Sequence, residues 1–321
     1  MNRNLQTTAA PVAPSRAGSL RRTVAKDFIT NKYLYLMILP VLAYYVLFHY
    51  APMYGAMIAF KNYSPMKGIL DSPWVGFAHF ESFFNSFYFW RIFKNTILIS
   101  LYSLLFEFPM PILLALLLNE VKNKTFKKTA QSITYMPYFI SMIVICGMIK
   151  DFTNSGGFIN TFFVSVMGTD GQAMLQKPEL FRSLYVISDI WQRIGWESII
   201  YMAALTSIDQ EQYEAARIDG ASRMQQIRNI TLPGILPVIV IMFILRSGNL
   251  LNVGFEKIIL LYNPVVYETS DVISSFVYRK GLLEFNWSYS SAVGLFNSVL
   301  NLLLLIAANR FSKKVTDNSL W

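Results

Sequence analysis

Long stretches without charged side chains recur along the chain. Residues 33–60, 129–149 and 285–309 contain no Asp, Glu, Lys or Arg. Each stretch is long enough for the roughly 20 apolar residues with which a helix crosses the hydrocarbon core of a bilayer. The pattern predicts an all-α membrane protein with six transmembrane helices. The predicted spans are residues 33–54, 95–118, 131–149, 184–206, 237–258 and 287–309.

The composition supports this interpretation. Of the 321 residues, 54% are hydrophobic and only 15% are charged, whereas soluble domains average about 25% charged residues. Residues 1–32 are polar and basic, so we expect a largely disordered cytoplasmic tail there, followed by a transmembrane domain over residues 33–321. Cys146 is the only cysteine, which excludes an intrachain disulfide and a thiolate metal site. We expect no metal site.

The distribution of Lys and Arg predicts the orientation of the chain. Cytoplasmic segments of membrane proteins carry an excess of these residues. With both termini in the cytoplasm, the inner segments hold 16 of the 28 Lys and Arg, and the whole net charge of +9 lies on the inner side. The positive charge is therefore explained by topology and lipid contact, and it gives no reason to expect a nucleic-acid partner.

The segment between the fourth and fifth predicted spans indicates two short cytoplasmic helices. Asp209 can cap the first, at residues 208–217, because an aspartate oxygen accepts hydrogen bonds from the free backbone N–H groups at a helix start. Gly220 fits the left-handed conformation that commonly ends a helix. A second helix is expected at residues 222–229. Small residues four apart leave a face that a partner can approach closely.

The same segment resembles the EAA loop in the permease subunits of ABC importers. The family pattern is Glu-Ala-Ala, three residues, Gly, nine residues, Ile, one residue and Leu-Pro. Every fixed position matches, at Glu214, Ala215, Ala216, Gly220, Ile230, Leu232 and Pro233. The resemblance implies that residues 207–232 form a coupling loop that docks in a groove of an ATP-binding subunit. The residues it assigns to ATPase coupling are Glu214, Ala215, Ala216, Asp219, Gly220, Ala221, Leu232 and Pro233.

The resemblance also implies a fold and a set of partners. It implies the type I ABC importer permease fold, as a multi-pass protein of the bacterial cytoplasmic membrane. The expected partners are a second permease subunit forming a heterodimer, two ATP-binding subunits and an extracytoplasmic solute-binding protein. ATP and Mg are expected on the partner ATPase, with no cofactor in this chain, which lacks the Gly-x-x-x-x-Gly-Lys-[Ser/Thr] phosphate loop. We expect a transport subunit and not an enzyme.

A second resemblance concerns the substrate. The stretches Trp74 to Phe80, Phe89-Trp90 and Lys94-Asn95-Thr96 are similar to maltose-type sugar permeases, most closely the branch for oligosaccharides derived from complex polysaccharides. It implies oligosaccharide import by alternating access. A permease of this class for a non-sugar solute, a proton-coupled secondary transporter and a membrane-embedded enzyme are the alternatives. Secondary transporters usually show two related halves, and the sequence shows none.

Charged residues inside the predicted spans mark candidate functional positions, because a charge at mid-membrane costs roughly 2.5–3.5 kcal/mol on insertion scales. The candidates in the interior of the spans are Glu107, Asp189, Arg193, Glu197 and Arg246. Glu197 and Arg246 lie at equal predicted depth, which predicts an intramembrane ion pair. Such charges can lock helices together or line a polar cavity, and we expect both. The predicted substrate-binding residues are Arg193, Trp196, Asn249 and Asn252, which combine a cation, an aromatic ring and amides.

Overall fold

The structure is a computed structural model that describes residue 27 and residues 30–316. Most of the predicted tail, residues 1–32, and the last residues of the chain therefore lie outside the described residues. The chain divides into two units, residues 1–57 and residues 58–321. Every regular element of the described residues is helical, as predicted.

One long helix makes up most of the described part of the first unit and ends three residues beyond it. α2 (Lys32–Tyr45) continues through a π-helical turn (Val46–Tyr50) and α3 (Ala51–Met53) into a 3-10 turn that ends at Phe60. No residue of α2 is buried, although its side chains are almost all apolar. A helix with this composition and exposure is stable in lipid and not in water.

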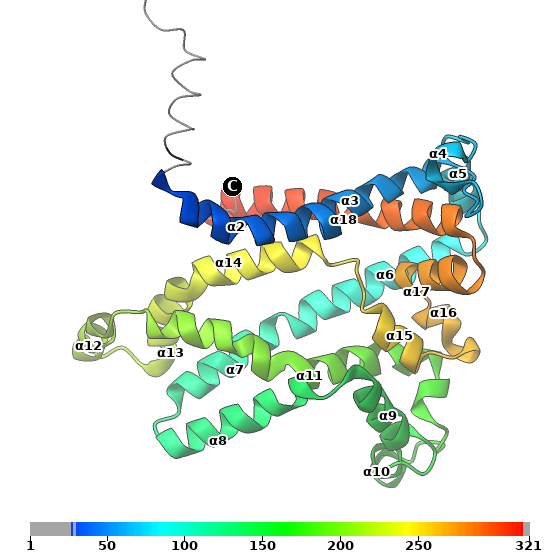
Figure 1. Cartoon of the computed structure of the whole chain (residues 1–321). Helices are drawn as coiled ribbons and strands as arrows, with labels where there is room; N and C mark the ends of the chain where they lie inside the picture. The colour runs from blue at the N-terminus through cyan, green and yellow to red at the C-terminus, as the bar shows by residue number, and fades with distance from the viewer. Residues whose placement is uncertain (1–26, 28–29, 317–321) are drawn as a thin grey trace, which may run out of the picture. The chain divides into compact units, whose positions relative to one another are not determined.

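The second unit is built around α11 (Pro178–Thr206), which packs against α7 (Pro109–Glu120), α14 (Leu232–Gly248) and α8 (Lys124–Tyr135). In Figure 1, α11 runs through the middle of this unit. A π-helical turn at Ser103–Glu107 joins α6 (Phe89–Tyr102) to α7, so that one helix continues from Phe89 to Glu120. The last long helix of the unit is α18 (Trp287–Thr316).

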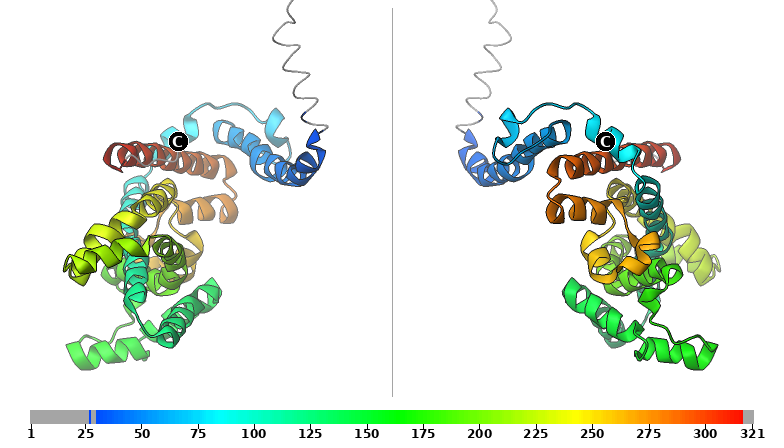
Figure 2. Two further views of the ribbon diagram at one scale, coloured as in Figure 1. Left: turned by 90° about the vertical axis from the view of Figure 1, so that its left-hand side faces the viewer. Right: turned by 90° about the vertical axis from the view of Figure 1, so that its right-hand side faces the viewer.

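The predicted third span is not one straight helix. α8 and a short 3-10 turn end at Phe139, and α9 (Met142–Thr153) starts in a direction 100° away. Pro137 and the extended backbone at Ile140 account for the break, because proline and an extended residue cannot continue an α-helix. The two arms diverge in both views of Figure 2. The helix over residues 131–149 is therefore broken near Ile140, and a membrane crossing at this place stays a prediction.

The predicted fifth span has the wrong limits. α13 (Arg223–Gln226) does not end near residue 229 but continues through a π-helical turn (Ile227–Thr231) into α14, which stops at Gly248. Residues 249–254 are not helical, and α15 (Phe255–Leu261) follows them. α18 supplies one of the backbone partners, since Asn301 accepts a hydrogen bond from the backbone N–H of Leu251 at 3.0 Å.

Four helices of the described residues are long and apolar enough to cross a membrane, and the bent pair adds up to one more. α11 does not qualify by composition, because Asp189, Arg193 and Glu197 lower its hydropathy, but its 29 residues extend for about 44 Å at 1.5 Å per residue. Six crossings therefore remain a prediction.

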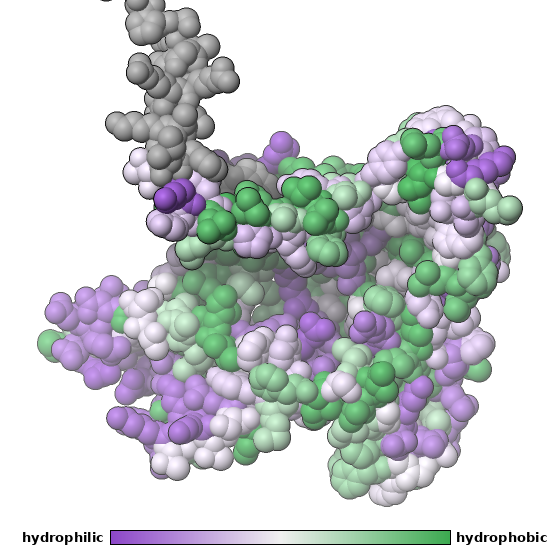
Figure 3. Space-filling model, viewed as in Figure 1, coloured by the Kyte–Doolittle hydropathy of each residue, from purple (hydrophilic) through white to green (hydrophobic). Residues whose placement is uncertain are grey.

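Short helices gather at the two ends of the second unit. α12 (Gln210–Ile218) and α13 lie at one end and α15 to α17 at the other (Figure 1). Figure 3 shows hydrophilic residues gathered over the α12 end. The remaining short helices are α4 (Gly68–Asp71), α5 (Ala78–Phe84), α10 (Phe158–Met167), α16 (Tyr267–Ser270) and α17 (Ile273–Tyr278).

The close approach of α11 to α8 depends on Gly195. A Cβ atom at this position would collide with the backbone carbonyl of Thr134 in α8. We predict that Gly195→Ala destabilises the protein by about 1–3 kcal/mol, as overpacking does elsewhere. The thermal unfolding midpoint and the yield of monodisperse protein measure this effect. Gly147→Ala in α9 is the matched control, because nothing lies within 4 Å of its new methyl group. Equal stability of the two variants would contradict the packing argument.

Candidate functional site

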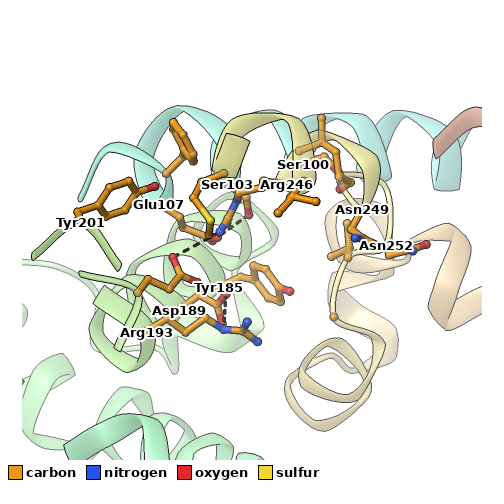
Figure 4. A pocket seen from close by; sticks show the side chains of 17 residues that line it. Ser100, Ser103, Glu107, Tyr185, Asp189, Arg193, Tyr201, Arg246, Asn249 and Asn252 are labelled. Carbon is orange, nitrogen blue, oxygen red and sulfur yellow. Dashed lines mark hydrogen bonds and ion pairs between the residues drawn. The ribbon is translucent and has the colours of Figure 1, made fainter. Parts of the chain in front are cut away.

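A polar cavity of about 350 Å³ lies in the middle of the second unit. Its walls come from the Ser103–Glu107 turn, α11, α14 and the non-helical residues 249–254 (Figure 4). A cavity with so many polar groups is unusual among helices that are otherwise apolar. The lining side chains that carry polar groups are Ser100, Ser103, Glu107, Tyr185, Asp189, Arg193, Glu197, Tyr201, Arg246, Asn249 and Asn252.

Arg246 of α14 contacts two carboxylates. Its guanidinium forms a short ion pair with Glu107 and lies 3.7 Å from Glu197 of α11. Ser103 donates a hydrogen bond to Glu107 at 2.8 Å, across the π-helical turn that presents both side chains. The sequence predicts a pair of Arg246 with Glu197, whereas Glu107 is the tighter partner in the structure. The signal was available, because Glu107 is a charged residue inside the second predicted span.

Asp189 of α11 contacts two cations. Lys257 of α15 donates a hydrogen bond to its carboxylate at 2.9 Å and a second one to the carbonyl of Tyr185 at 3.0 Å. Arg193, one turn further along α11, lies 3.3 Å from the same carboxylate. Lys257 is fully buried, and it is not among the predicted charged positions because it sits at the very end of the predicted fifth span. A buried lysine at that position needed an acidic partner, which is the signal that could have found it.

The predicted substrate residues separate into two groups. Arg193, Asn249 and Asn252 line the cavity. Trp196 does not, because its ring stacks on Tyr138 with centroids 4.7 Å apart. The expectation that Trp196 belongs to the cavity wall is therefore not met. Asn252 also has a structural contact, since its side-chain oxygen accepts a hydrogen bond from Asn297 of α18 at 2.8 Å.

The helix α12 forms an exposed surface at one end of this unit. Asp209 caps its start by accepting a hydrogen bond from the N–H of Glu211 at 3.0 Å, as predicted. Its end is closed by Gly220, whose φ of 75° is left-handed, and by the bond from the N–H of Ala221 to the carbonyl of Ala216 at 2.8 Å. This 6→1 bond is typical of a Schellman motif.

The same helix is anchored on one side and open on the other. Ile208 is buried beneath it, and the hydroxyls of Tyr213 and Thr231 lie 3.0 Å apart. Ile218 is 87% exposed and Met224, in the adjoining α13, is 71% exposed. Glu214, Ala215 and Asp219 of the predicted coupling set are also exposed, and Ala216 and Ala221 are half-buried. Leu232 and Pro233 instead open α14.

The position of α12 in the chain connects it to the cavity. α11 ends at Thr206, immediately before α12, and α13 runs without interruption into α14. α11 and α14 carry Asp189, Arg193, Glu197 and Arg246 into the cavity wall. α12 is therefore linked to both walls of the cavity by short non-helical segments, residues 207–209 and 219–222.

Comparison with known proteins assigns the chain to a family. The family described as binding-protein-dependent transport system inner membrane component matches residues 107–317, the region that carries the cavity and α12. The chain belongs to this family. It is a permease subunit of an ABC importer, it is embedded in the cytoplasmic membrane, and it is a transport component and not an enzyme.

Individual relatives of this permease agree with that assignment. The polygalacturonan/rhamnogalacturonan transport system permease protein YteP of Bacillus subtilis (strain 168) is 43% identical to it over 94% of each chain. A chain in the crystal structure of a bacterial ABC transporter involved in the import of the acidic polysaccharide alginate is 44% identical, with a TM-score of 0.84. It covers 92% of this permease and 99% of its own length. The type I importer fold is thereby confirmed.

A second structure of the alginate transporter has the same TM-score of 0.84 and is 43% identical over 92% of this permease and 99% of the matched chain. In that structure the transporter is in complex with an alginate pentasaccharide-bound periplasmic protein.

The two carboxylates around Arg246 are predicted to contribute unequally to stability, Glu107 more than Glu197. Glu107→Ala leaves Arg246 with only the longer pair, and loss of one member of a buried ion pair costs roughly 3–5 kcal/mol. Glu197→Ala removes the longer and more exposed ion pair. We expect it to lower the free energy of unfolding by about 1 kcal/mol or less. Thermal unfolding of the purified permease compares the two variants. The double variant Glu107→Ala/Arg246→Ala is expected to recover part of the loss, and equal losses in the two single variants would contradict the ranking.

Proposed function

We propose that this permease passes oligosaccharides across the cytoplasmic membrane through the cavity between α11 and α14. Its partners are a second permease subunit, two ATP-binding subunits that hold ATP and Mg, and an extracytoplasmic binding protein that delivers the sugar. The observation that carries the proposal is the polar cavity itself, whose two walls are joined by the exposed helix α12.

The chemistry of the cavity suits a hydroxyl-rich solute. Asn249 offers an amide donor and acceptor, Asn252 offers an amide donor, and Ser100 and Ser103 offer hydroxyl oxygens as acceptors. These groups form hydrogen bonds with neutral sugar hydroxyls. The names of the relatives support an oligosaccharide as well, because polygalacturonan, rhamnogalacturonan and alginate are all polysaccharides. Arg193, Asn249 and Asn252 are the residues assigned to substrate.

Coupling to ATP hydrolysis is assigned to α12 and its surroundings. Glu214 to Ala221 would sit in a groove of the ATP-binding subunit, with Ile218 and Met224 as apolar contacts. Six crossings with both termini in the cytoplasm would place this helix on the inner side. Closure of the ATPase dimer would then move α12, and α11 and α14 with it, so that the cavity opens alternately to the two sides.

Reconstitution tests the proposed function. The permease is placed in proteoliposomes with its partner permease, the two ATPase subunits and the binding protein, and uptake of labelled trisaccharides, neutral and acidic, is measured. We expect uptake that requires ATP and the binding protein. Uptake driven by a proton gradient without ATP would contradict the importer mechanism, and uptake of amino acids but of no oligosaccharide would contradict the substrate class.

Gly220 provides a test of the docking surface. It is exposed, has a φ of 75°, and has nothing within 4 Å of a Cβ atom. In Gly220→Trp the indole would occupy the surface assigned to the ATPase, and a side chain in this backbone region costs about 1–2 kcal/mol. We expect a folded permease that transports at least 10-fold more slowly. Gly168→Trp is the matched control, because Gly168 has a φ of 66° and open surroundings at the end of α10. Normal transport by Gly220→Trp would disprove the docking assignment.

A further inference from the structure

The charged groups around the cavity are balanced in number but not in exposure. Three acids (Glu107, Asp189 and Glu197) and three bases (Arg193, Arg246 and Lys257) form the cluster. The Arg193 side chain is 44% exposed, more than any other member, whereas the carboxylates of Glu107 and Asp189 are largely covered. Glu197, the most accessible acid, is 27% exposed. Arg193 is therefore the charged side chain of the cluster that is most accessible to a solute.

Arg193 is also the cation that the cluster can release most easily. Asp189 keeps Lys257 as a close partner at 2.9 Å, and Lys257 is only 1% exposed and cannot turn to solvent. Arg246 is held by two carboxylates. The Nε of Arg193 lies 3.3 Å from Asp189 but makes no hydrogen bond within the described part of the chain. If Arg193 turns away, Asp189 is still neutralised, so the desolvation penalty of an unpaired buried carboxylate is avoided.

We propose that Arg193 binds a carboxylate of the transported oligosaccharide, so that the cavity selects sugars that carry uronic acid units. This inference rests on the proposed function and adds a charge requirement to it. The planar guanidinium offers paired N–H donors that match a carboxylate in a bidentate geometry. The sugar carboxylate takes the place of Asp189 as the partner of Arg193, and the number of paired charges in the cavity does not fall.

The surroundings of Arg193 support a sugar acid over a simple anion. Arg193 projects from α11, and Asn249 and Asn252 stand on the other side of the cavity (Figure 4). The amides can bond ring hydroxyls while the guanidinium holds the carboxylate of the same unit. A cavity of about 350 Å³ lies at the lower end of the roughly 300–1,000 Å³ range of small-molecule sites. The cavity therefore contacts a few sugar units and not a whole oligosaccharide.

A pair of matched ligands tests this inference. Trigalacturonate and its fully methyl-esterified form share one backbone, and only the first is charged. The assembled complex is placed in nanodiscs, and its thermal unfolding midpoint is measured with each ligand at millimolar concentration and fixed ionic strength. We expect wild-type protein to be stabilised more by the acid than by the ester. Dissociation constants from these shifts should differ by about 10-fold or more, as expected for a hydrogen bond to a charged group.

Substitutions then test whether Arg193 causes the preference for the acid over the ester. Arg193→Gln is expected to bind the acid and the ester equally, and Arg193→Lys to keep part of the preference. Arg310→Gln, an exposed arginine of α18 outside the cavity, is the control for loss of one positive charge and should discriminate like wild type. If Arg193→Gln does not fold, the comparison of acid and ester on wild-type protein still decides whether the charge is recognised.

The failure of this inference differs from the failure of the proposed function. Equal binding of acid and ester by wild-type protein, or a preference that survives in Arg193→Gln, would overturn the role of Arg193 and leave oligosaccharide import intact. ATP-dependent uptake of a neutral trisaccharide at the same rate as the acidic one would also overturn the role of Arg193. Absence of uptake for every oligosaccharide would instead reject the proposed function, and this inference with it.

Discussion

Charged groups inside a membrane protein must be neutralised by one another, and this constraint fixes the arrangement of the central helices. Arg246 of α14 joins Glu107, at the π-helical turn before α7, to Glu197 of α11. Lys257 of α15 contacts Asp189 of α11. Because an unpaired charge is costly at this depth, α7, α11, α14 and α15 cannot separate without losing ion pairs. The cluster holds these helices together and also surrounds the cavity.

The same constraint applies to the backbone. Where a helix stops at membrane depth, its free N–H and C=O groups need partners within the protein. After α14 ends at Gly248, Asn301 accepts from the N–H of Leu251 and Ser100 donates to the carbonyl of Leu250 at 2.6 Å. Asn301 and Asn297 also donate to Asn252. Polar residues of α6 and α18 thus allow a non-helical segment to line the cavity, and this segment carries Asn249 and Asn252, the amides proposed to bind substrate.

Local signals in the sequence were sufficient for some elements and not for others. The cap at Asp209 and the left-handed Gly220 depend on neighbouring backbone groups only, so α12 could be predicted closely. The break at Ile140, the end of α14 at Gly248 and the partners of Arg246 and Lys257 depend on contacts between distant residues. Hydropathy puts Trp196 in a predicted span but cannot show that its ring stacks on Tyr138. A periodic pattern gives the face of a helix, and tertiary packing decides what that face contacts.

The strengths of the ion pairs indicate which contact yields when the walls of the cavity move. Glu107–Arg246 and Asp189–Lys257 are close and largely buried, whereas Glu197 and Arg246 are 3.7 Å apart and both partly exposed. Exposed, long pairs contribute little to stability and are therefore the least costly to open. Glu197–Arg246 is also the direct ionic contact between α11 and α14, the two helices that adjoin the α12–α13 segment. Under the proposed function, a force on α12 would open this contact before Glu107–Arg246 or Asp189–Lys257. Arg193 and Asn249 lie on opposite sides of the cavity (Figure 4), where a sugar acid could contact both.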